Sequence, residues 1–98
     1  MKQLQKQAFE LLKNKSGNTP LIIKAIEEFS EMQQVLARYL NKDVADGSHM
    51  DIDRFDIMEE VADVQIVTDF IIKIFDFNQH NIDMIKRDKL DKVIKNNS

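Results

Sequence analysis

Four acidic side chains form two pairs with helical spacing, Glu28/Glu31 and Glu60/Asp63. The members of each pair are three positions apart, so on a helix they leave the same face, with Cβ atoms about 5–6 Å apart. Each pair also lies in or beside an apolar stripe, where a carboxylate without a neutralising partner is costly. If the two helices pack together, the four carboxylates converge, and a hard divalent cation is the simplest means of neutralising them. This pattern makes the chain a candidate enzyme.

The ligand types restrict the metal. All four side chains offer oxygen, and no His or Cys lies within reach of either pair. Such a ligand set selects Mg²⁺, or Mn²⁺, over Zn²⁺ and Cu²⁺. A di-iron site in a helical bundle would need a Glu-x-x-His motif, which neither His49 nor His80 supplies. Because Mg²⁺ is usually held by a few carboxylates together with waters and phosphates, the pattern predicts phosphate chemistry. A carboxylate that does not bind the metal would orient or deprotonate the attacking water.

The second pair carries the stronger signal. At about 100° per residue, Glu60 and Asp63 fall inside the apolar stripe of their helix, together with Ile57, Val64, Val67, Phe70, Ile71 and Ile74. Exposing the two carboxylates would therefore carry apolar neighbours into water. Ion pairs with basic residues of other helices are the structural alternative, but a buried ion pair contributes little net stability. We therefore favour a functional role for Glu60 and Asp63.

The first pair is less specific. Glu28 and Glu31 flank the apolar arc of their helix and do not penetrate it. Glu27 and Glu31 can also be ordinary solvated charges paired with Lys24 or Arg38. The evidence for a functional role of the first pair becomes stronger when it is combined with the second pair on the next helix.

Composition indicates a single helical domain that spans residues 1–98. The chain is 43% apolar and 32% charged, and it contains one Pro, two Gly and no Cys. So few helix breakers favour helices throughout, and the absence of Cys fits a reducing compartment. The formal net charge of −3 argues against general nucleic-acid binding. We find no signal peptide and no continuous apolar span, so we expect a cytoplasmic protein with neither nucleic acid nor membrane as a partner.

Apolar periodicity predicts four helices in a bundle-like, all-α domain. Thr19 and Pro20 are typical residues for the start of the second helix, and clustered Asp, Gly and Ser predict a long central loop. The first two predicted helices cover residues 2–14 and 20–40. Asp51 or Asp53 caps the third, which extends to about residue 75, and Asn81 or Asp83 opens the fourth, which extends to residue 94; the predicted breaks are 16–20, 41–53 and 76–81. Within the central loop, Gly47-Ser48-His49-Met50 matches a common expression-vector remnant, so it is either natural or an engineered junction, and His49 is given no functional role.

The third helix also predicts association between chains. After Glu60 its apolar residues cover most of its circumference, which is typical of a buried helix. Four short helices of one chain cannot cover one of their number so completely. We therefore expect a homodimer or homotetramer with this helix at its centre, although a merely apolar core helix is the alternative.

The acidic motif resembles a known family. The order Glu27-Glu28-x-x-Glu31 followed by Glu60-x-x-Asp63 is similar to the EExxE…ExxD signature of the MazG-like all-α nucleoside triphosphate pyrophosphohydrolases. The similarity covers about residues 20–92. It implies hydrolysis of a nucleotide between its α- and β-phosphates, giving the monophosphate and pyrophosphate with Mg²⁺. It also implies that Glu28, Glu31, Glu60 and Asp63 are the catalytic metal ligands, with Glu27 in doubt, and that the chain forms dimers or tetramers.

The same resemblance gives a role to the basic C-terminal segment. Because the family tends to hold phosphates there with a lysine, Lys86 and Lys89 are the candidate substrate-binding residues. A solvated helix face balanced by three aspartates explains the same residues equally well. Two other classes of function stay open: a non-enzymatic oligomerisation or adaptor module with salt-bridged acids, and a regulatory nucleotide binder without turnover.

Overall fold

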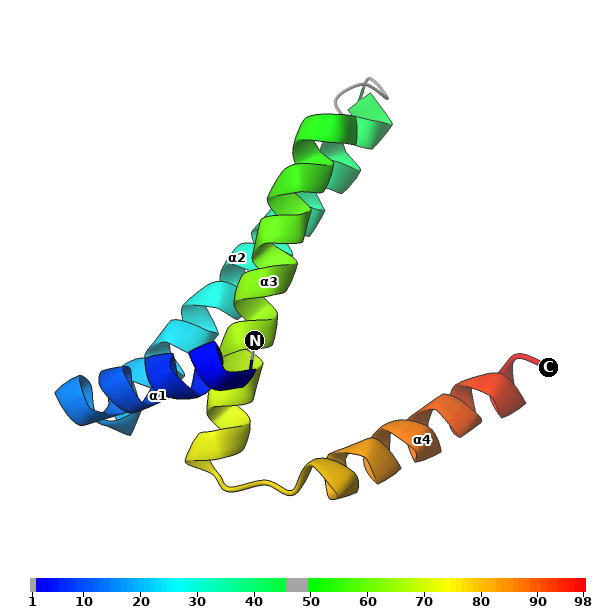
Figure 1. Ribbon diagram of the computed structural model, residues 1–98. Helices are drawn as coiled ribbons and strands as arrows, with labels where there is room; N and C mark the ends of the chain where they lie inside the picture. Colours follow the sequence, from blue (N-terminus) through cyan, green and yellow to red (C-terminus); the bar gives the residue numbers. More distant parts are fainter. Residues whose placement is uncertain (1, 46–49) are drawn as a thin grey trace.

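The structure is a computed structural model that describes residues 2–45 and 50–98, and all its regular elements are helices. They are α1 (Lys2–Ser16), α2 (Asn18–Ala45), α3 (Met50–Ile74) and α4 (Gln79–Asn96), shown in Figure 1. The prediction of an all-α chain with four helices is thus confirmed over these ranges. None of the helices in the described ranges combines the length and the apolar character needed to cross a membrane.

A single glycine separates α1 from α2. Gly17 has a φ of 80°, a left-handed conformation that glycine adopts without steric strain. Its N–H donates to the carbonyl oxygen of Lys13 at 2.7 Å, which closes the end of α1. The next helix starts at Asn18, so Pro20 lies in its first turn, where the missing N–H has no intrahelical partner to lose. The predicted break over residues 16–20 is therefore much shorter than expected.

The central loop is also shorter than predicted. The second helix continues through Ala45 and the third begins at Met50, whereas a loop over residues 41–53 was expected. The physical reason is that Asp, Asn and Lys only mildly disfavour a helix, and the predicted loop contains no proline. The Gly47, Ser48 and His49 part of the vector-like tetrapeptide lies outside the described residues.

The main packing unit is the antiparallel pair of α2 and α3, which lie side by side along most of their length (Figure 1). The first helix crosses this pair near its lower end in that view. The Phe9 ring of α1 lies 5.7 Å from the Phe70 ring of α3, measured between centroids. The two rings belong to a small hydrophobic core formed where α1, α2 and α3 meet. It consists of Phe9, Leu21, Ala25, Val67 and Phe70, with Ala8, Ile66, Ile71 and Ile74 packed around it.

The link between α3 and α4 is fixed by hydrogen bonds at both of its ends. Asp76 adopts a φ of 54°, and the N–H groups of Asp76 and Phe77 donate to the carbonyl oxygens of Lys73 and Ile72. These two bonds form a Schellman motif, which ends a helix. On the other side, the Asn78 side chain accepts from the His80 N–H at 2.8 Å and caps α4. The fourth helix therefore begins at Gln79, earlier than the predicted residue 81 or 83.

The fourth helix projects away from the other three (Figure 1) and contains no buried residue. Ile85, Leu90 and Val93 are more than half exposed, whereas Ile82 in the first turn is partly buried. The radius of gyration is 16.9 Å, compared with about 12.5 Å for a compact domain of this length. Within one chain, α1, α2 and α3 pack together, whereas α4 approaches α3 only through its first turns, so the predicted four-helix bundle is incomplete.

Candidate metal centre

The contact surface between α2 and α3 brings three of the four predicted acids together. One carboxylate oxygen from each of Glu28, Glu60 and Asp63 lies within 4.8 Å of the others. We refer to these three residues as the acid triad. Glu28 follows buried Ala25 on α2 by three positions, and Asp63 precedes buried Val67 on α3 by four, so core packing directs both carboxylates toward the opposing helix.

Burial within the acid triad differs from the sequence-based expectation. Glu28 is the most buried, with an exposed fraction of 4%, whereas Glu60 and Asp63 are half-buried. The sequence placed Glu28 beside the apolar arc because it took the exposed side chains of Ile26, Phe29 and Leu36 for the core. In the structure α2 instead turns Leu21, Ala25, Glu28 and Val35 toward α3.

Two buried carboxylate oxygens lack a hydrogen-bond partner among the residues that the structure describes. They are Oε2 of Glu28 and Oε2 of Glu60. The other oxygen of Glu28, Oε1, accepts from Lys24 Nζ at 2.9 Å. A buried polar atom without a partner costs about 1–3 kcal/mol, and more when it is charged. The unsatisfied oxygens of the acid triad therefore fit a cation bound between α2 and α3.

The three carboxyl groups have different proton affinities. The hydrogen bond from the Lys24 ammonium lowers the pKa of Glu28, although burial acts in the opposite direction. Burial raises the pKa of Glu60, and the negative charges of Glu31 and Glu28 raise it further. Burial, followed by the charge of Glu28, also raises the pKa of Asp63. Glu28 therefore loses its proton at a lower pH than its ordinary value, and Glu60 and Asp63 lose theirs at a higher pH.

The fourth predicted ligand lies at the edge of the acid triad. Glu31 is exposed, yet it is close enough to Glu60 to raise the pKa of that carboxyl group. Glu27 is exposed as well. The structure thus brings Glu31 beside the triad but not into it. Arg38, which the sequence offered as a partner for the glutamates of α2, binds Asp56 of α3 at 2.9 Å.

The acid triad opens into a shallow cleft of about 210 Å³ between α1, α2 and α3. The cleft is lined by Lys24, Glu28 and Asp63 together with Leu12, Ile66, Val67 and Phe70. Lys24, whose ammonium group is bound to Glu28, therefore lies where a ligand in the cleft would meet a positive charge. Sequence reasoning missed this role, although the spacing of Lys24 and Glu28, four positions apart on one helix, was a usable signal.

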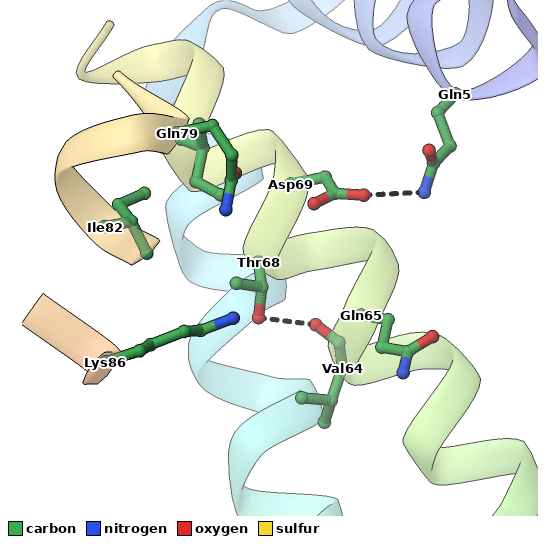
Figure 2. A pocket seen from close by; sticks show the side chains of 9 residues that line it. Gln5, Val64, Gln65, Thr68, Asp69, Gln79, Ile82 and Lys86 are labelled. Atoms are coloured by element: carbon green, nitrogen blue, oxygen red, sulfur yellow. Dashed lines mark hydrogen bonds between the residues drawn. The ribbon is translucent and has the colours of Figure 1, made fainter. Parts of the chain in front are cut away.

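The two predicted substrate-binding lysines lie elsewhere. Lys86 lines a separate cavity of about 330 Å³ that shares no lining residue with the acid cleft. Figure 2 shows its side chain extending from α4 toward Thr68, while Gln5 of α1 donates a hydrogen bond to Asp69 at 2.8 Å. Lys89 is exposed on α4. Because α4 projects away from α2, neither lysine joins the acid triad within one chain.

Comparisons of the chain with family models, with curated proteins and with solved structures found no match.

Proposed function

We propose that the protein is a Mg²⁺-dependent nucleotide pyrophosphohydrolase that cleaves nucleoside triphosphates to the monophosphate and pyrophosphate. The observation that carries the proposal is the acid triad itself. Three carboxylates from two packed helices lie within 4.8 Å of one another, and two of their buried oxygens have no hydrogen-bond partner among the described residues. The order of these acids along the chain, with its similarity to the MazG-like signature, supplies the substrate class.

The donor set fits Mg²⁺, with Mn²⁺ as a substitute, because it consists of oxygen atoms only. Glu28, Glu60 and Asp63 would hold the ion, with Glu31 as an additional ligand or a base. Bound there, Mg²⁺ would neutralise the carboxylates and the negative charge of the phosphates. Among the charged residues that line the cleft, Glu28 and Asp63 are negatively charged and at least half-buried, whereas Lys24 is positively charged and exposed.

The chain's own residues supply the remaining parts of the reaction. Water attacks either the α- or the β-phosphorus atom of the anhydride, the bridging P–O bond breaks, and the leaving group is pyrophosphate in the first case and the nucleoside monophosphate in the second. Glu31, which is exposed and close enough to Glu60 to raise its pKa, would orient the water and take its proton. Lys24 lines the cleft and can neutralise a phosphate oxygen.

A panel of common and modified nucleoside tri- and diphosphates, incubated with the protein and Mg²⁺, tests this function through the release of pyrophosphate or phosphate. We expect at least one triphosphate to yield stoichiometric monophosphate and pyrophosphate, and chelation of Mg²⁺ to stop the reaction. Turnover that persists in excess chelator, or no turnover of any nucleotide, would contradict the proposal.

A non-enzymatic helical module is the second candidate, and the ion pairs favour it. Lys24–Glu28 and Arg38–Asp56 show that basic residues neutralise part of the acidic charge near the acid triad. In that case the acids hold α2 and α3 together, and neutralising Glu60 would destabilise the fold without removing an activity. Binding of a Mg²⁺–nucleotide complex without turnover would instead indicate the regulatory nucleotide binder.

A further inference from the structure

An ion pair within the acid cleft already places a positive charge on one member of the acid triad. Lys24 Nζ lies 2.9 Å from Oε1 of Glu28. The two residues are four positions apart on α2, so ordinary helix geometry brings their side chains together. Their environments differ, because the side chain of Lys24 is 57% exposed and that of Glu28 is only 5% exposed. A solvent-exposed ammonium group thus binds a buried carboxylate.

The ammonium group of Lys24 neutralises only part of the acid triad. Within the described ranges, Oε2 of Glu28 and Oε2 of Glu60 are buried without a hydrogen-bond partner. A cation held by the triad would therefore bind the same carboxylate, that of Glu28, whose other oxygen already accepts from Lys24. Two positive charges on one carboxylate repel each other. Lys24 and a divalent cation thus compete for Glu28.

We propose that Lys24 is an internal counter-ion of the acid triad, whose ammonium group competes with the divalent cation for Glu28 and moves to the phosphates of the ligand once the cation is bound. This inference rests on the proposed function, because it concerns the regulation of the same cation site. Lys24 then has two opposite effects. It weakens the binding of a cation alone, and it strengthens the binding of phosphates to the cation-loaded site.

The properties of a lysine side chain make its release from Glu28 easy. Its ammonium group is carried on a flexible four-carbon stem with three rotatable donors. Because the side chain of Lys24 is more than half exposed, water solvates the ammonium group as it leaves. Ion pairs with an exposed partner also contribute little to stability, so their loss is a small cost. A divalent cation can therefore displace Lys24 without disturbing the packing of α2 against α3.

The lining of the acid cleft determines what the released ammonium group meets. Among the described residues that line the cleft, Lys24 is the basic one, and the others are the acids Glu28 and Asp63 and four apolar side chains. Lys86 lines the separate cavity. A phosphate bound to the cation would therefore find its cationic hydrogen-bond donor in Lys24.

The exchange of partners by Lys24 couples the two ligands. A cation that takes Glu28 frees the ammonium group for a phosphate, and a phosphate that holds the ammonium group leaves Glu28 free for the cation. Because such coupling is reciprocal, each ligand raises the affinity for the other by the same factor. The cleft would thus bind a cation together with phosphates more tightly than a cation alone.

Calorimetric titration of the chelator-treated full chain with Mn²⁺ or Mg²⁺ alone tests the competition, with Lys24→Met as the variant. Methionine has about the length of lysine but no charge. We expect the variant to bind the cation at least about fivefold more tightly, the factor that two unit charges 4 Å apart produce even in water. Lys6→Met is the matched control, because Lys6 is an exposed lysine four positions before Glu10 and does not line the acid cleft. It should leave the cation affinity unchanged within about twofold at physiological ionic strength, where remote charges are screened.

A second titration uses inorganic pyrophosphate, a product of the proposed reaction, in saturating Mg²⁺. Lys24→Met should bind pyrophosphate at least about tenfold more weakly, because a hydrogen bond from a charged donor is lost. Lys24→Arg keeps the positive charge, so it should bind the cation no more tightly than the unmodified chain and should still bind pyrophosphate. Circular dichroism should show the same helix content for every variant. A misfolded variant would bind both ligands more weakly, whereas Lys24→Met should change the two affinities in opposite directions.

Four results would overturn the inference. They are a cation affinity that Lys24→Met leaves unchanged or lowers, an equal gain in Lys6→Met, an unchanged affinity of Lys24→Met for pyrophosphate, and no saturable cation binding by either the unmodified chain or Lys24→Met. The proposed function is judged separately, by turnover. Opposite shifts of the two affinities without turnover of any nucleotide would support the role of Lys24 and contradict the enzyme. Turnover with an unchanged cation affinity in Lys24→Met would do the reverse.

Discussion

Three carboxyl groups within 4.8 Å of one another cannot all ionise freely, because like charges at this distance raise each other's pKa. In the structure, the pKa of one of these carboxyl groups is lowered and the pKa values of the other two are raised. Lys24 keeps Glu28 ionised, while burial and the neighbouring charges favour the protonated forms of Glu60 and Asp63. A divalent cation would replace these protons, so its binding should be coupled to their release.

Substituting Glu60 by Gln should separate function from stability. The neutral amide keeps the shape of the side chain but removes a ligand, so Mg²⁺-dependent pyrophosphate release should fall by about a hundred-fold or more, since even outer-shell substitutions at metal sites cost up to that factor. The metal-free variant should melt at the same temperature or higher, because a charge repelled by Glu31 and Glu28 is gone.

Glu59→Gln is the matched control for that variant, because Glu59 is the adjacent, exposed glutamate of the same helix. It should keep both activity and melting temperature. Equal losses in the two variants, or a marked destabilisation by Glu60→Gln with no activity in the unmodified protein, would favour the salt-bridged module.

The pH dependence of stability should change sign when Mg²⁺ is added. The raised pKa values of Glu60 and Asp63 mean that the folded, metal-free chain holds their protons more tightly than the unfolded chain does. Their contribution to stability is therefore complete below the ordinary carboxyl pKa of about 4 and is lost as pH rises through the raised values. Glu28, whose pKa is lowered, contributes in the opposite sense, and its part is lost only at more acidic pH.

Melting curves between pH 5 and 8, recorded in chelator and in Mg²⁺, measure this effect. In chelator the melting temperature of the unmodified chain, relative to that of Glu60→Gln, should fall as pH rises. In Mg²⁺ it should rise, since deprotonated carboxylates bind the cation better. Identical pH profiles with and without Mg²⁺ would speak against a cation in the acid triad.

At the residue scale, the spacing of the acids in the sequence was sufficient to predict that they lie close together, but not to predict which of them is most buried. The three-residue spacings of Glu28/Glu31 and Glu60/Asp63 placed four carboxylates near one another, and the structure joins three of them. Which side of α2 faces α3 could not be read from the sequence, because α2 carries apolar residues on two sides. That ambiguity concealed both the burial of Glu28 and the access of Lys24 to the cleft.

At the scale of the helices, the acid triad lies at the contact between α2 and α3, and α1 lines one side of the acid cleft through Leu12. The first helix is held chiefly by Phe9, which is 5% exposed, and by the hydrogen bond from Gln5 to Asp69. The ammonium groups of Lys13 and Lys73 lie within 5.7 Å of the Phe9 ring centroid. Phe9 is thus the main packing contact between α1 and α3.

Phe9→Ala should therefore destabilise the chain by about 3–5 kcal/mol, the usual range for truncating a buried phenylalanine. Leu11→Ala on the same helix is the control, because Leu11 is 71% exposed, and its effect should stay within about 0.5 kcal/mol. Urea unfolding followed by circular dichroism gives both values. Equal effects of the two substitutions would mean that α1 does not pack against α3 as described.

The cap of α4 makes a local prediction. Asn78→Ala removes the side-chain acceptor of the His80 N–H and should weaken the first turn of α4 by about 1 kcal/mol. Hydrogen exchange should show faster exchange in that turn, with little change in α1, α2 or α3, because α4 contains no buried residue. Asn81→Ala, at an exposed position without a capping role, should not have this effect. Faster exchange throughout the chain would show that α4 packs more closely than the structure indicates.

Helix boundaries were predicted less well than the helices themselves, for a local reason. The left-handed conformation of Asp76 and the cap at Asn78 determine where α3 ends and α4 begins, and neither residue type specifies these conformations by itself. Conversely, the clustered polar residues at 41–45 predicted a loop, yet α2 continues through Ala45.

At the scale of the whole molecule, one chain leaves many large apolar side chains exposed, and α4 projects away from the other three helices. Periodicity predicted four helices and association between chains, and the structure confirms the helices. The direction of α4 was not predictable, because it depends on a few backbone dihedral angles in a short link. That direction also explains why Lys86 lies away from the acid triad.

Isothermal titration of chelator-treated protein with Mg²⁺ or Mn²⁺, followed by the same titration of Glu60→Gln and Glu59→Gln, measures most directly whether the acid triad holds a cation. We predict one saturable site per chain that releases protons on binding, is abolished or greatly weakened in Glu60→Gln and is retained in Glu59→Gln. Absence of saturable binding to the unmodified chain, or equal binding by Glu60→Gln, would contradict the account.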